Sequence, residues 1–126
     1  MLFDDDRLVA LIDFDDAYEG ALVDDLAVMI ADWAAEPGAT ALRHDLAAHV
    51  VCAYQRFRRL TAAEAELLPD CVTLFLLGDA TSHVHDGLAH GQGGDEAVAH
   101  CHVLKLYQSV QADTGWPNVL RRAAGN

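Results

Sequence analysis

The sequence predicts a mainly α-helical fold, with an N-terminal β-hairpin plus a bundle of four or five helices. Two apolar segments flank an acidic turn near the N-terminus, apolar residues then recur with helical spacing, and "EPG" and "GQGG" interrupt that pattern. A chain of 126 residues fits one domain, 1–126, in which roughly two-thirds of the unfolded surface becomes buried.

The hairpin is expected over residues 1–14. The segments "MLF" and "LVALIDF" are apolar, and "DDDR" between them is rich in aspartate, a residue that favours turns because its side chain hydrogen-bonds to nearby backbone.

The helical bundle is expected over residues 24–113. Its first helix carries apolar residues at the spacing of one face: Leu26, Met29, Ile30 and Trp33. Asp24 and Asp25 precede them as N-terminal caps, where carboxylates meet free N–H groups and the positive end of the helix dipole. A second helix is predicted from a Thr40 cap, with one apolar side formed by Leu42, Leu46, Val50, Ala53 and Phe57.

Two or three further helices complete the predicted bundle. The segment "TAAE" fits a capping box between Thr61 and Glu64, and Pro69 suits the first turn of a further, longer helix that runs to "GQGG". The segment "DEAVAHCHVLKLYQSVQ" reads as the last helix. Beyond it, "TGWPN" reads as a turn, and we expect 114–126 to form a frayed C-terminal tail.

The composition excludes several classes of protein. Eight basic against 20 acidic residues give a formal net charge of −12, which argues against nucleic acid or an anionic membrane as a partner. Three widely spaced cysteines do not form a disulfide framework, so a reducing cytoplasm is the simpler compartment. The sequence has no basic, apolar leader and no apolar run that approaches the ~20 residues of a membrane span.

Closely spaced carboxylates make "LIDFDDAYEGALVDDLAVMIADW", residues 11–33, the leading candidate site. Asp13 directly follows an apolar strand, a position from which carboxylates commonly hold Mg²⁺ against phosphates. The alternative is a solvated turn at Asp15 and Asp16, and spacing alone favours that alternative for the whole cluster.

The same stretch resembles the metal-binding segment of the aminoglycoside phosphotransferase superfamily, nearest to its type II homoserine kinase-like branch. The matching residues are Ile12-Asp13-Phe14, then Gly20, then Asp25-Leu26-Ala27. The resemblance implies the C-terminal helical subdomain of a kinase-like fold, with Asp13 as a Mg²⁺ ligand and Asp15 as an auxiliary ligand. It also implies that Asp25 is a structural residue that caps its helix.

Other elements of that family are absent from these 126 residues. They contain no His-Gly-Asp catalytic loop and no Gly-rich nucleotide loop, and their single lysine is Lys105. The expected function is therefore a catalytically incomplete phosphotransferase-like domain, a binding or assembly module or the product of a truncated gene, with no cofactor of its own. The alternative is one half of a split kinase, completed by a separate N-lobe polypeptide that would also complete a Mg²⁺ site.

The missing covering elements also predict self-association. In the kinase-like fold, the hairpin and the first helix pack against the catalytic loop and N-lobe. Without them, residues 1–14 and the Leu26–Trp33 face leave a strand edge and apolar side chains exposed, and a two-fold homodimer would bury both.

The histidines suggest a third possibility, a metal-binding protein. His83, Asp86 and His90 share one helix face by spacing and would need a further ligand such as His100 or Cys101 to hold Zn²⁺. The spacing matches no standard zinc signature, so we favour exposed polar histidines over a metal site.

Overall fold

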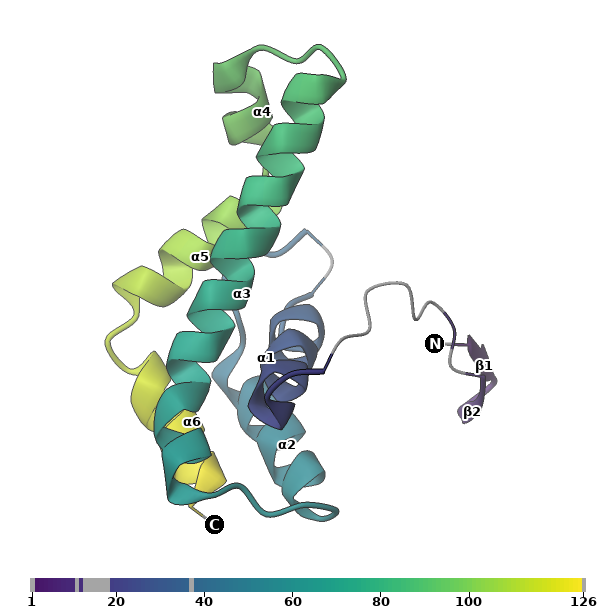
Figure 1. Ribbon diagram of the computed structural model, residues 1–126, viewed down its shortest axis with the longest axis vertical. Coiled ribbons are helices and arrows are strands. Elements are labelled where there is room, and N and C mark those ends of the chain that lie inside the picture. Colours follow the sequence, from purple (N-terminus) through teal and green to yellow (C-terminus); the bar gives the residue numbers. More distant parts are fainter. Residues whose placement is uncertain (1, 11, 13–18, 37, 126) are drawn as a thin grey trace.

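The computed structural model describes residues 2–10, 12, 19–36 and 38–125. In this part of the chain a two-stranded hairpin precedes six helices, which confirms the mainly α fold class (Figure 1). The strands are β1 (Leu2–Asp4) and β2 (Arg7–Ala10), and the helices are α1 (Leu22–Trp33), α2 (His44–Gln55), α3 (Ala62–Ala89), α4 (Gly94–His100), α5 (His102–Ala112) and α6 (Trp116–Ala124). No helix among the described residues combines the length and apolarity needed to cross a bilayer.

The hairpin forms within the predicted range, over residues 2–10 of the described chain. The strands pair antiparallel, with Phe3 opposite Leu8 and Asp4 opposite Arg7. Asp5 in the turn has a φ of +51°, a left-handed conformation that aspartate tolerates better than most residues. Nearly every hairpin residue is exposed, and Figure 1 shows the two strands standing apart from the helices.

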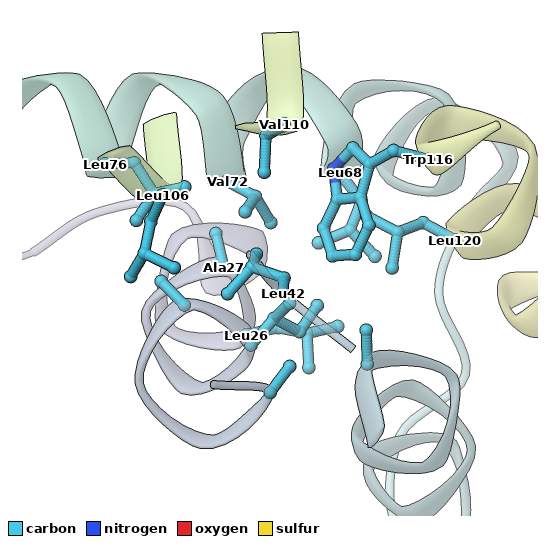
Figure 2. Packing of buried hydrophobic residues seen from close by; sticks show 14 of the residues in the cluster. Leu26, Ala27, Leu42, Leu68, Val72, Leu76, Leu106, Val110, Trp116 and Leu120 are labelled. Atoms are coloured by element: carbon cyan, nitrogen blue, oxygen red, sulfur yellow. The ribbon is translucent and has the colours of Figure 1, made fainter. Parts of the chain in front are cut away.

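Helix α3 forms the centre of the bundle. Helices α1, α5 and α6 pack along it, and α2 packs against α1 and α6. Figure 2 shows their shared core, in which the largest fully buried side chains are Trp116, Leu26, Ile30, Leu68, Leu76, Leu120, Val51 and Val72. These side chains come from several helices and pack around α3. Their shared burial holds together elements that are distant in sequence.

The capping box that starts α3 is confirmed. The Thr61 hydroxyl accepts a hydrogen bond from the Glu64 N–H, and the Glu64 carboxylate accepts one from the Thr61 N–H at 2.8 Å. The prediction that a new helix starts at Pro69 was wrong, because α3 continues through Pro69 as one helix of 28 residues. Proline has no N–H, so the helix lacks the bond to the Ala65 carbonyl at this turn and continues beyond it.

The "GQGG" break ends α3 in a defined way. Gly91 has a φ of +86°, the Gly91 N–H donates to Leu88 O, and the Gln92 N–H donates to Gly87 O. This arrangement is a Schellman motif, in which the left-handed glycine turns the chain back across the helix end. Gly87 allows the close return, because a Cβ there would lie 3.2 Å from the Ala97 Cβ of α4.

Helix α2 differs from its prediction in where it starts and in which of its faces is buried. It begins at His44 rather than after Thr40, and its buried residues are Ala47, Val51 and Gln55. Phe57, which the sequence placed on the apolar face, lies beyond the helix and is 91% exposed.

The segment after "GQGG" contains two helices rather than one. Cys101 separates α4 from α5 with an extended backbone, and its sulfur accepts a hydrogen bond from the Leu104 N–H as the cap of α5.

The predicted C-terminal tail, 114–126, was wrong. Residues 116–124 form α6, whose buried residues are Trp116, Leu120, Ala123 and Ala124. Their spacing of four, three and one residues is that of a single helix face.

Candidate functional site

The predicted metal ligands Asp13 and Asp15 lie outside the described residues, as do Phe14 and Asp16. Of the motif's other members, Ile12 and Gly20 are exposed, and Leu26 and Ala27 are buried in the core. The metal assignment of Asp13 and Asp15 therefore stays a prediction.

Asp25 does not cap its helix. Helix α1 begins at Leu22, its N-cap residue is Ala21, and no side chain caps it through a hydrogen bond. Asp25 instead lies exposed in the first turn, beside a surface hollow of about 240 Å³ that is lined by Glu19, Gly20, Ala21, Leu22 and Asp25. A carboxylate there still meets the positive end of the helix dipole.

The histidines do not converge as a zinc site requires. The ring of His90 bonds to the backbone oxygen of Asp86, and Cys101 points into the core, where its sulfur lies 3.7 Å from Ala80 O. His83 turns away from Asp86 and contacts the Asp79 carboxylate at 3.1 Å. Within the described residues, no group of three or more His, Cys, Asp or Glu side chains is placed to hold a metal ion.

A cavity of about 210 Å³ between α1, α3 and α5 brings several ionisable side chains together in the described part of the chain. Its polar wall includes Asp32, Asp79 and His102, and its apolar wall includes Phe75 and Leu106. His83 borders it, since the His83 ring meets that of His102 edge to face at 5.8 Å.

Electrostatics set the chemistry of this cavity. Burial raises the pKa of Asp32, and the negative charge of Asp79 raises it further. Two carboxylates that disfavour each other's charge retain a proton more readily than isolated ones. The nearby His83 offers a counter-charge to Asp79 when it is protonated.

Sequence reasoning missed this cavity. Asp32 and Asp79 lie on different helices. Asp32 falls within the stretch 11–33 but was given no role there, and Asp79 belongs to no recognised motif. The available signal was a carboxylate on each of two helices, but the sequence alone does not show which faces of α1 and α3 meet.

A basic surface lies elsewhere, where α2 and α6 both end. A second hollow, of about 260 Å³, is lined there by Cys52, Gln55, Arg56 and Arg59. Glu64, near this end, has its pKa lowered to about 2, mainly by the hydrogen bond from the Arg58 guanidinium and also by bonds from Thr61.

No family model, curated protein or solved structure matches this chain.

Proposed function

We propose that these 126 residues form a catalytically incomplete phosphotransferase-like domain that acts as a binding or assembly module in the cytoplasm. The observation that carries the binding role is the hairpin, whose two strands pair with no other strand among the described residues and present apolar side chains to solvent. The motif at residues 11–33 supports the kinase-like ancestry, and three free cysteines are compatible with a reducing compartment.

The exposed apolar surface of the hairpin is large for its size. Leu2, Phe3, Leu8 and Val9 are each about half exposed, at 47–54%. Both faces of the hairpin thus carry exposed apolar side chains, and an unpaired strand edge is a template for a partner strand.

The proposed partner is a second copy, in a two-fold dimer. On α1, Leu26 and Ile30 belong to the core and are unavailable to a partner, whereas Met29 and Trp33 are 36% and 48% exposed. The proposed interface therefore includes the hairpin, and from the predicted α1 face it can include Met29 and Trp33. Light scattering of the full chain at micromolar concentration should report about twice the 13.6 kDa chain mass, and a monomer that unfolds cooperatively would contradict the assembly role.

A separate experiment tests whether the chain alone lacks phosphotransferase activity. The 126-residue chain should release no ADP from Mg-ATP in the presence of homoserine, choline or an aminoglycoside, because it offers no catalytic aspartate in a His-Gly-Asp loop. Turnover that disappears in Asp13→Ala would overturn this proposal.

The split-kinase alternative rests on the order Asp13, Gly20, Asp25 in the acidic motif. It requires a separate polypeptide that carries the nucleotide lobe and catalytic loop. Mg-dependent phosphoryl transfer by the mixture of both chains, and by neither alone, would favour it over the assembly module.

A further inference from the structure

The basic residues of this acidic protein gather at one end. Five of the eight lysines and arginines form what we call the basic end: Arg56, Arg58, Arg59, Arg121 and Arg122. Gln55 ties the two contributing helices together, since its side-chain amide donates to the Ala123 carbonyl at 2.9 Å. Figure 1 shows the end of α2, the start of α3 and the C-terminus at the same end of the bundle.

Part of this positive charge is neutralised locally and part is not. Arg58 pairs with Glu64 at 2.6 Å. Arg121 lies 2.8 Å from a Glu66 oxygen, although its Nε–H has no acceptor in hydrogen-bond geometry. Arg56 and Arg122 are exposed and pair with no carboxylate among the described residues. The basic end therefore keeps uncompensated positive charge in a chain of net charge −12.

The basic end also carries an unusual apolar side chain. Phe57, between Arg56 and Arg58, is 91% exposed, the highest value among the exposed large apolar residues. The hollow of about 260 Å³ at this end is bordered by Arg56 and Arg59, the first of which directly precedes Phe57 in the sequence. Aromatic and arginine side chains together are the composition enriched at protein–protein interfaces.

The hairpin has the complementary chemistry. Asp5 and Asp6 form its turn, are exposed, and make no ion pair with a described residue. Asp4 contacts Arg7 loosely, at 3.7 Å. Phe3 and Leu8 lie opposite each other, one residue pair behind the turn, and are about half exposed. The hairpin tip thus combines carboxylates with an apolar pair, as the basic end combines guanidinium groups with Phe57.

We propose that the hairpin tip of one copy docks on the basic end of a second copy, reciprocally in a two-fold dimer. The carboxylates of Asp5 and Asp6 face Arg56 and Arg122, and the apolar pair behind the turn covers Phe57. This inference rests on the proposed function in taking the hairpin as the docking element, and it specifies the surface that receives the tip.

Opposite charges across an interface weaken its dimer as the salt concentration rises. A purely apolar contact between two chains of net charge −12 would instead tighten, because salt screens their mutual repulsion. Sedimentation equilibrium of the full chain should show the dimer dissociation constant rising at least about tenfold between about 0.1 M and about 1 M salt. Arg56→Glu should weaken the dimer by about tenfold or more at the lower salt, because it places like charges together. Lys105→Glu, on α5, changes the net charge equally and should leave the dimer nearly unchanged apart from general repulsion.

A charge exchange completes the test. Asp6→Lys alone should weaken the dimer, and Asp6→Lys combined with Arg56→Glu should restore most of the wild-type affinity. Circular dichroism melts verify that each variant is folded, and Asp6→Lys tests the contact from the hairpin side if Arg56→Glu is destabilised. A dimer insensitive to salt and to both substitutions would overturn this inference and leave the proposed assembly role standing, whereas a wild-type monomer at the lower salt would overturn both.

Discussion

Thr61 stabilises the start of the central helix α3 through its side chain. Its hydroxyl and the Glu64 carboxylate satisfy each other's backbone N–H groups, and Arg58 fixes that carboxylate from the preceding loop at 2.6 Å. These bonds cap the first turn of the central helix.

We predict that Thr61→Ala lowers the free energy of unfolding by about 1 kcal/mol, the usual cost of losing an N-cap. The matched control is Thr81→Ala, because the Thr81 hydroxyl donates only to the Leu77 carbonyl within the same helix. Urea denaturation of the two variants measures the difference. Equal effects would mean that the capping box adds nothing to stability.

Residue-level prediction failed at Asp25 for a physical reason. Carboxylates are favoured throughout the first turn of a helix, not only at the N-cap. Asp24 and Asp25 therefore marked the beginning of α1 correctly to within one turn, while the cap position fell on Ala21, which has no side-chain acceptor. The pattern alone does not distinguish these two positions.

At the scale of elements, the capping box and the "GQGG" break were readable because each depends on a few adjacent residues. Pro69 was misread because proline suits a first helical turn and is tolerated further in, so its local signal was ambiguous. Helix α6 was missed although Trp116, Leu120 and Ala123 show helical spacing, because the preceding "TGWPN" was read as a turn leading to a frayed end. Pro117 in fact occupies the first turn of that helix.

Helix α6 is expected to be essential to the core. We predict that Leu120→Ala destabilises the fold by about 2–5 kcal/mol, since its side chain is fully buried between α2 and α3. Asn118→Ala, an exposed position in the same helix, should cost much less. Thermal melts of the two variants make this comparison, and similar midpoints would restore the view of a frayed tail.

Asp113 connects the start of α6 to the start of α2. Its carboxylate bonds to the His44 ring and accepts hydrogen bonds from the N–H groups of Gly115 and Trp116. The bond from His44, followed by those backbone bonds, lowers the pKa of Asp113 below its usual 3.8. A lowered folded-state pKa means that the ionised form stabilises the fold, fully above the unfolded-state pKa and less as the pH falls through the folded value.

We therefore predict that Asp113→Ala destabilises the protein most above about pH 5 and progressively less toward pH 2. Denaturant midpoints of both proteins across this range give the measurement. Asp95→Ala, at an exposed position in the first turn of α4, controls for general charge removal. A difference that stays constant with pH would show that the contribution of Asp113 is not ionic.

At the scale of the whole molecule, the sequence predicted the fold class and the net charge, but not how charges are distributed in space. A net charge of −12 conceals the basic end, because Arg56 follows α2 and Arg122 lies on α6, and the ends of these two helices meet only in the folded chain. The cavity near Asp32 and Asp79 is hidden for the same reason, since its walls come from three helices. Sites formed by tertiary packing leave no contiguous pattern to read.

The length of α3 has a consequence for motion. Its buried residues end at Ala80. Beyond that point Val84 still packs on the core and His83 meets the His102 ring of α5, but most side chains are exposed, and α4 packs against this part of the helix (Figure 1). Local opening is easiest where few apolar contacts hold a helix. The rate of native-state hydrogen exchange should therefore differ along this one helix. Backbone amides near Val72 should exchange only on global unfolding, and those near His85 should exchange orders of magnitude faster. Uniform protection would instead mean that the whole of α3 opens as a single cooperative unit.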